Sequence, residues 1–155
     1  MAWSASKVFT ATVEDVFENT TAFDADSNTF KAALFDNSIT PSQTVASAST
    51  AYGAGVWASG GVADVTGWPA VGRDLVVAST GSGNTSYMFD SADTASANSN
   101  TTLAANYGCL VYDDTLTTPV ADQGICFNYF GGAQQVTAGS FTIVWHANGV
   151  WSIAF

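Results

Sequence analysis

The sequence predicts a mainly β fold, an antiparallel β-sandwich or barrel-like domain with a short N-terminal α-helix. Short segments of β-branched and aromatic residues alternate with turn-forming residues, including 14 glycines. The chain has 155 residues, of which 47% are hydrophobic and 13% aromatic. A chain of this length buries roughly 70% of its unfolded surface in one core. We therefore expect residues 1–155 to form a single β-rich domain.

Residues 1–20 are expected to form an N-terminal helical arm. Between residues 7 and 18 the apolar positions recur at helical spacing, with carboxylates on the opposite side. The apolar positions are Phe9, Val13, Val16 and Phe17. This pattern predicts one amphipathic helix that ends near Asn19.

The first strand is predicted at residues 29–35, followed by a turn at residues 36–38. Residues 41–72 then form a long glycine-rich loop region, for which we expect ordered structure with one or two short strands. Because the apolar pieces in this region are short and glycines interrupt them, longer elements are not expected there.

Two further short strands are predicted at residues 74–78 and 86–89, separated by a turn at residues 81–84. A polar stretch rich in Ser, Asn and Thr follows and runs to Thr102. Such closely spaced short strands are typical of a sandwich or barrel.

Two hairpins are predicted in the C-terminal half. Residues 107–113 and 124–130 are both rich in aromatic and β-branched residues and are predicted to pair. Residues 141–146 and 150–155 flank Asn-Gly, the dipeptide that favours a type I′ turn, and are predicted to pair as well. The last hairpin would be apolar on both faces. We therefore expect a sandwich partner to cover one face, and the helix, a loop or another chain to cover the other.

The charge of the chain limits its partners. Three basic residues stand against 13 carboxylates, which gives a net charge of −10. This charge disfavours binding to nucleic acid and to anionic membranes, and no apolar stretch approaches the roughly 20 residues of a membrane span. The first residues also lack a secretory signal, so we expect synthesis in a cytosol.

The thiols Cys109 and Cys126 are expected to be reduced, buried and inert, since both lie within apolar strands. A disulfide between neighbouring strands remains an alternative. The single histidine, His146, is expected to be a partly exposed hairpin residue opposite Trp151. With so few groups for acid-base or nucleophilic chemistry, we expect neither an enzyme nor a cofactor.

Carboxylates cluster in two parts of the sequence, where their oxygens could hold a hard cation such as calcium. Residues 24–28 resemble the opening of a calcium-binding loop, but Thr29 and Phe35 occupy the positions that require Gly and Glu, so a simple turn is the preferred interpretation. Three further carboxylates are expected to be solvated loop charges, with a bound hard cation as the alternative. They are Asp113, Asp114 and Asp122.

Several segments together resemble a family of virion structural proteins from phages that infect actinobacteria. The resemblance spans nearly the whole chain and is carried by residues 1–7, 29–37, 67–73, 110–115, 119–132 and 141–151. They include Gly-Trp-Pro-Ala-Val-Gly-Arg, Leu-Val-Tyr-Asp-Asp-Thr and Gly-Ile-Cys-Phe-Asn-Tyr-Phe-Gly-Gly. The resemblance implies a virion component that has no catalytic residues.

From this resemblance we expect a non-enzymatic capsid decoration or accessory protein that binds and stabilises the phage head lattice at the capsid surface. The expected partners are the major capsid protein and further copies of the chain, in a homotrimer or another cyclic oligomer. The alternative is a tail or surface adhesin that binds host glycans through exposed aromatic residues. The expected partner contacts are Trp3, Phe9, Phe17, Trp57 and Trp68.

Overall fold

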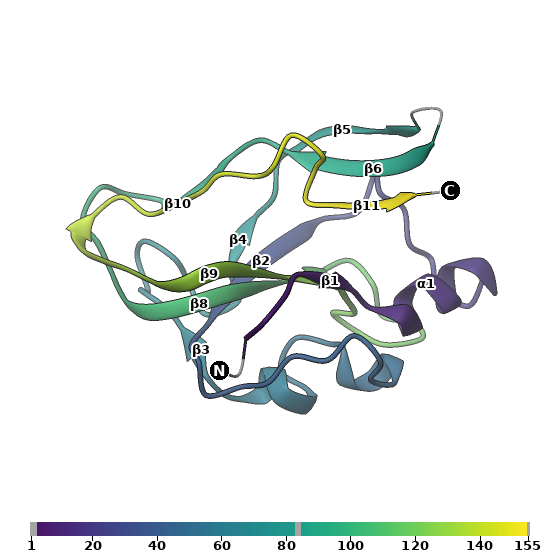
Figure 1. The fold of residues 1–155 in the computed structure, drawn as a ribbon, viewed down its shortest axis with the longest axis horizontal. Coiled ribbons are helices and arrows are strands. Elements are labelled where there is room, and N and C mark those ends of the chain that lie inside the picture. The colour runs from purple at the N-terminus through teal and green to yellow at the C-terminus, as the bar shows by residue number, and fades with distance from the viewer. Residues whose placement is uncertain (1–2, 83–84, 155) are drawn as a thin grey trace.

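A central antiparallel sheet lies between two other layers (Figure 1). The structure is a computed structural model that describes residues 3–82 and 85–154. On one side of the central sheet lie a three-stranded and a two-stranded sheet, and on the other side lies a loop layer with two short 3-10 helices. The two sheet layers form an open sandwich, which confirms the predicted fold class and excludes a closed barrel.

The central sheet has the strand order β1-β9-β8-β2-β3, and β4 also pairs with β2. The three-stranded sheet has the order β11-β6-β5, and the two-stranded sheet pairs β10 with β7. The elements are β1 (Lys7–Val8), α1 (Thr10–Phe17), β2 (Phe30–Phe35), η1 (Ser47–Ser49), η2 (Gly55–Ala58), β3 (Gly61–Val62), β4 (Arg73–Asp74), β5 (Val77–Ser82), β6 (Ser86–Ser91), β7 (Thr94–Ala95), β8 (Thr101–Asp113), β9 (Gly124–Gly139), β10 (Thr142–Ile143) and β11 (Trp151–Ala154).

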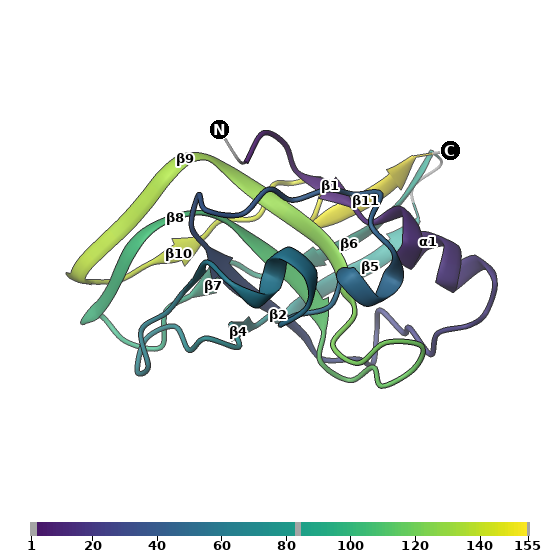
Figure 2. The same cartoon turned by 90° about the horizontal axis from the view of Figure 1, so that it is seen from below.

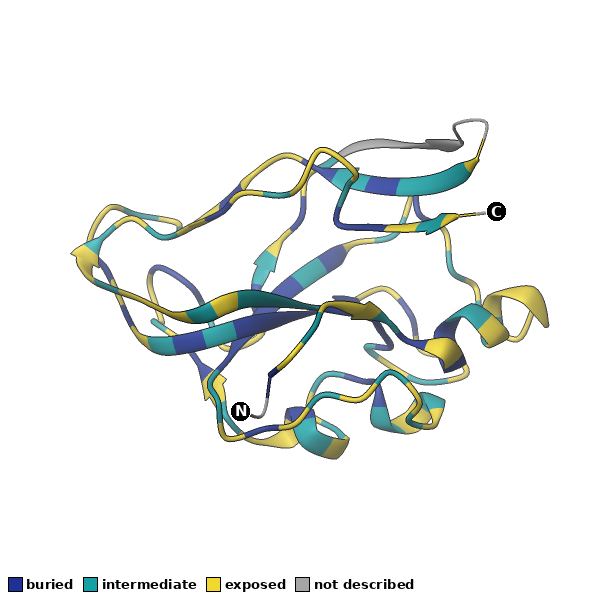
Figure 3. Cartoon of the chain, viewed as in Figure 1, coloured by how far each residue is buried: buried dark blue, intermediate teal, exposed yellow. Residues whose placement is uncertain are grey.

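Strand β2 explains why the fold has three layers. Its alternate side chains belong to two different hydrophobic clusters, because both faces of the central sheet are buried (Figure 3). Phe30 and Leu34 pack toward the smaller sheets, whereas Ala33 and Phe35 pack toward the loop layer. The glycine-rich region predicted at residues 41–72 forms most of that loop layer, with η1, η2 and the short strand β3.

The predicted strand at residues 29–35 and the predicted hairpin of residues 107–113 with 124–130 are confirmed. β8 and β9 pair in the expected antiparallel register, for example Leu110 with Phe127, and both strands continue well beyond the predicted segments. The long ends of this pair curve toward β7 and β10 (Figure 2), and Leu103 in the extended part of β8 remains in the core.

The N-terminal helix is shorter than predicted. It begins at Thr10, because Lys7 and Val8 extend the central sheet as strand β1 and pair with Phe127 and Cys126 of β9. The next amide, of Phe9, donates to the carbonyl oxygen of Ile125 at 3.0 Å, so the chain leaves the sheet directly into the helix. Residues 1–2 of the predicted arm lie outside the described residues.

The predicted C-terminal hairpin is wrong. Residues 142–143 form β10 and pair with β7, whereas residues 151–154 form β11 and pair with β6. A turn does form between them, closed by the amide of Gly149 on the carbonyl oxygen of His146, but the flanking segments separate into two sheets. Each finds a strand partner further away in the sequence, and Ile143 and Trp151 are buried in these pairings. Phe155, included in that prediction, lies outside the described residues.

The segments between the long strands differ in detail from the prediction. The strand predicted at residues 74–78 is divided between β4 and β5, and the polar stretch before Thr102 contains β7. The strand at residues 86–89 is confirmed as β6 and extends to Ser91. Of the predicted turn at residues 81–84, residues 81–82 belong to β5 and residues 83–84 lie outside the described residues.

Candidate functional site

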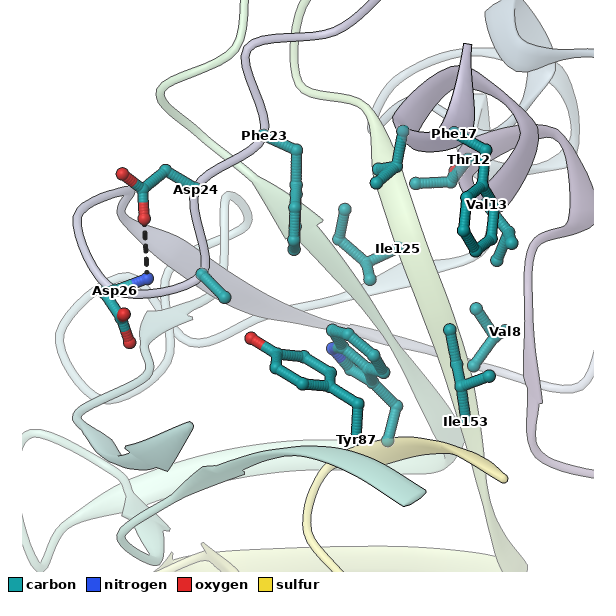
Figure 4. Close-up of a pocket in the computed structure, with 13 residues that line it drawn as sticks. Val8, Thr12, Val13, Phe17, Phe23, Asp24, Asp26, Tyr87, Ile125 and Ile153 are labelled. Atoms are coloured by element: carbon teal, nitrogen blue, oxygen red, sulfur yellow. Dashed lines mark hydrogen bonds between the residues drawn. The ribbon is translucent and has the colours of Figure 1, made fainter. Parts of the chain in front are cut away.

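An apolar groove opens between the two sheet layers beside α1 (Figure 4). It has a volume of about 450 Å³, and its wall comes from six parts of the chain: β1, α1, the loop before β2, the start of β9, and the strands β6 and β11. The lining residues are Val8, Thr12, Val13, Val16, Phe17, Phe23, Asp24, Ala25, Asp26, Tyr87, Ile125, Trp151 and Ile153. We call this the apolar groove.

Polar contacts on its inner side hold α1 in place. The Thr12 hydroxyl donates to the carbonyl oxygen of Gly124 at 2.6 Å. The Asp15 carboxylate accepts from the amide nitrogen of Gln123 at 2.6 Å and from the Ser47 hydroxyl at 2.7 Å. Since these contacts join the helix to β9, to the β8–β9 connection and to η1, the helical wall of the groove is preformed.

The opposite wall is aromatic. The Trp151 ring stacks on the buried ring of Phe89, with 5.9 Å between centroids and 9° between planes. Tyr87 and Phe23 contact the same indole at 5.8 Å and 6.3 Å. This packing fixes the rings, so the groove presents a rigid aromatic surface.

The charged groups around the groove are acidic. Asp24 and Asp26 are the two charged residues among those that line it. The Asp24 carboxylate accepts hydrogen bonds from the backbone amide of Asp26 and the Ser27 hydroxyl, both at 3.0 Å, and these bonds lower the pKa of Asp24. It is therefore ionised at neutral pH.

The acidic rim continues on the outer side of α1. A second, shallower hollow there is lined by Glu14 and Glu18, and it shares Val8, Val13 and Phe17 with the apolar groove. An occupant of the groove would therefore meet apolar side chains at the centre and carboxylates on both sides of the helix.

These groups are suited to binding. The groove offers apolar side chains and the carboxylates of the loop before β2, and the described residues that line it include no histidine, cysteine or lysine. The thiols of Cys109 and Cys126 lie fully buried elsewhere as free cysteines, and burial raises the pKa of both, that of Cys126 to about 12. Protonated, buried thiols are poor nucleophiles.

His146 does not lie opposite Trp151, so that prediction is wrong. Its Nδ1 accepts the backbone amide of Asn148 at 3.0 Å within the turn before β11, and its side chain is exposed. The register error follows from the hairpin error, because Trp151 pairs with Phe89 instead.

Four of the five predicted partner contacts are core residues. Trp3, Phe9, Trp57 and Trp68 are each at most 2% exposed, so they cannot reach a partner while the domain is folded. The prediction that these four residues contact a partner is therefore wrong. The fifth, Phe17, is 77% exposed and lines the apolar groove, so it alone keeps its assignment as a candidate contact.

Most groove residues were missed by the sequence analysis, since they come from separate parts of the chain. Tyr87 and Ile153 become neighbours only because β6 pairs with β11, and the sequence analysis predicted a different partner for β11. A weak signal was available at Phe23, an aromatic residue placed directly before the acidic turn at residues 24–28. That turn is formed as expected, with Asp24 accepting from Asp26 and Ser27.

Asp113, Asp114 and Asp122 were expected to be solvated loop charges, and for Asp113 that prediction is wrong. Asp114 and Asp122 lie near each other, since burial and the charge of Asp114 raise the pKa of Asp122. Asp113 is buried and accepts from the Asn28 amide at 2.6 Å and the Thr115 backbone amide at 2.9 Å, and burial raises its pKa. Asp114 instead forms an ion pair with Lys31 at 2.7 Å. Within residues 3–82 and 85–154, no three His, Cys, Asp or Glu side chains are arranged to hold a metal ion.

Comparison of the chain with models of known protein families, with curated proteins and with solved structures finds no match. The likeness to phage virion proteins therefore stays an expectation from the sequence. No helix in the described part of the chain is both long enough and apolar enough to span a bilayer.

Proposed function

We propose that this chain is a non-enzymatic structural protein of a phage virion, a decoration or accessory protein that attaches to the major capsid protein through the apolar groove. The observation that carries the proposal is the groove itself. Its apolar surface is preformed and open to solvent, and it is bordered by Phe17, a large side chain left mostly exposed. We name a capsid as the partner because the sequence resembles phage virion proteins.

In this role the protein acts by mass action. A chain that binds only the assembled lattice stabilises that lattice by an amount set by its affinity and occupancy. Repetition around symmetric lattice points favours a homotrimer or another cyclic oligomer at the capsid surface. Many weak attachments then add to a large total effect.

Cryo-electron microscopy of the intact virion tests the location. Density for this fold on the capsid lattice supports the proposal, whereas copies confined to the tail contradict it. The attachment surface is tested in the same particles with the variants F17D and V65D. Val65 is 93% exposed and does not line the groove, so V65D is the matched control.

F17D places a charge at the mouth of the groove and should reduce occupancy on the capsid, whereas V65D should leave occupancy unchanged. Equal occupancy for both variants would contradict attachment through the groove. The circular dichroism spectra of both variants should match the unmodified protein, because both side chains lie mainly in solvent.

The adhesin alternative has one observation in its favour. Phe23, Tyr87 and Trp151 stand beside the carboxylates of Asp24 and Asp26, and such combinations of rings and hydrogen-bond acceptors also bind sugars. Trp3, Trp57 and Trp68 lie in the core and therefore cannot contribute to sugar binding. A glycan array separates the two functions: selective binding that Y87A abolishes favours the adhesin, and no binding favours the capsid protein.

A further inference from the structure

The occupant of the apolar groove can be specified further, in an inference that rests on the proposed function and narrows it. We propose that the groove binds an extended apolar segment of another protein, with lysine or arginine beside its apolar side chains, and that this segment adds to the free edge of β11. The occupant is thus a strand, and a second copy of this chain is not expected there.

The first support is a free sheet edge at the groove. β11 is the end strand of the three-stranded sheet, and β6 is its one neighbour among the described strands. Its residues Trp151 and Ile153 line the groove directly. An exposed edge offers backbone donors and acceptors to an incoming strand, and the apolar pockets beside it accept alternate side chains.

The second support is the neighbouring edge strand of the other sheet. β1 is the end strand of the central sheet, and its residue Val8 lines the apolar groove together with Trp151. The same two residues also line a smaller hollow that contains Ser6 and Ser152. Both hollows therefore lie at the two edge strands β1 and β11, which an added strand would contact.

The third support is an unpaired donor. Trp151 is 9% exposed, and its indole N–H is buried without an acceptor among the described residues. A peptide brings backbone carbonyl oxygens, whereas a purely aliphatic ligand such as a fatty-acid tail brings no acceptor along its length. This donor favours a peptide over a lipid tail.

The charges specify the rest of the partner. The rim around the groove carries Glu14, Glu18, Asp24 and Asp26, against the single cation Lys7 among the residues that line the adjoining hollow, and the whole chain has a net charge of −10. Two copies that met at this surface would bring like charges together, which is unfavourable. A partner segment with basic side chains is complementary, and its association should weaken as salt concentration rises.

The test is a selection from a displayed library of random short peptides against the purified protein. The enriched peptides should alternate apolar residues with lysine or arginine. When bound, they should protect the β11 amides from hydrogen exchange. Enrichment without a basic preference, protection confined to α1, or no enrichment would each overturn the proposal.

A charge-neutral rim variant tests the electrostatic part. E14Q/E18Q/D26N removes three rim charges and should weaken binding of the selected peptides about tenfold at low salt, since three modest exposed ion pairs together account for a change of that size. The control D74N/D90N/D93N removes the same charge away from the groove and should change binding less than about twofold. Equal effects of both variants would refute complementarity at the rim.

This outcome is distinct from that of the proposed function. If F17D loses capsid occupancy while the peptide selection fails, attachment through the groove stands and the strand occupant is wrong. If selected peptides bind as described but the protein is absent from the capsid, the occupant stands and the location is wrong. Self-association that F17D abolishes would show that a second copy fills the groove, and it would overturn the inference.

Discussion

Replacing Phe9 and Phe17 by alanine in separate variants should separate a core residue from a contact residue within one short segment. Phe9 is fully buried, and its ring contacts Trp57 at 6.2 Å and Phe127 at 5.4 Å between centroids. Deleting such a ring leaves a cavity at the junction of β1 and α1. F9A should therefore lower the free energy of unfolding by about 3–5 kcal/mol.

F17A should behave differently, because 77% of the Phe17 side chain already lies in solvent. Full burial of a phenylalanine is worth about 1.5–3 kcal/mol, so the quarter that is buried here contributes less than about 1 kcal/mol. Under the proposed function, attachment to the capsid should nevertheless fall in F17A. The loss of stability and the loss of binding are thus expected in different variants.

The measurement is urea unfolding followed by far-ultraviolet circular dichroism, with the free energy extrapolated to water. Ellipticity is preferred to fluorescence because Trp57 contacts Phe9 directly and its emission would change for local reasons. If F17A destabilised the domain as much as F9A, the helix would be packed more tightly than the structure shows, and the reasoning about the groove would be refuted.

Three further predictions concern groups outside the groove or behind it. Asp64 accepts four hydrogen bonds that lower its pKa to about 2. Its contribution to stability is therefore present above pH 4 and is lost as the pH falls toward 2. In thermal unfolding, acidification should lower the melting temperature of D64N less than that of the unmodified protein. D15A leaves the buried side-chain amide of Gln123 without its acceptor, so it should lower the free energy of unfolding by about 1–3 kcal/mol. Hydrogen exchange in α1 should also become faster, and unchanged exchange would contradict the anchoring role of Asp15. Cys109 and Cys126 should not react with a thiol reagent until the protein unfolds, because both thiols are buried and their pKa values are raised. Rapid labelling of the native protein would contradict their buried position.

The parts of the fold that were predictable are those whose partners lie close in sequence. The pairing of residues 107–113 with 124–130 follows from two adjacent apolar segments and a short connection, and the structure confirms it. The strand at residues 29–35 was recognisable from its composition, and its burial on both faces follows from its central place in the sheet.

The C-terminal segments show where local patterns fail. Asn148-Gly149 favours a tight hairpin, and a turn indeed forms there, but hairpin pairing would have had to compete with pairing to β6 and β7. In the structure Trp151 gains the stacked ring of Phe89, and Ile143 is buried opposite Thr94. Tertiary burial outweighs the local turn signal, and no feature of residues 141–155 alone shows it.

The helix α1 shows why the groove could not be predicted and why it points to a partner. An amphipathic surface helix normally turns its apolar side to the core. Here Thr12 is buried and Asp15 is bonded to Gln123 on the inner side, whereas Val16 and Phe17 remain largely exposed. The sequence pattern predicts the helix but not its rotation, because the rotation is set by hydrogen bonds to residues more than a hundred positions away. A helix held by its polar groups leaves its apolar side chains for another molecule to cover, and a partner that buries them gains a free energy that folding alone leaves unused.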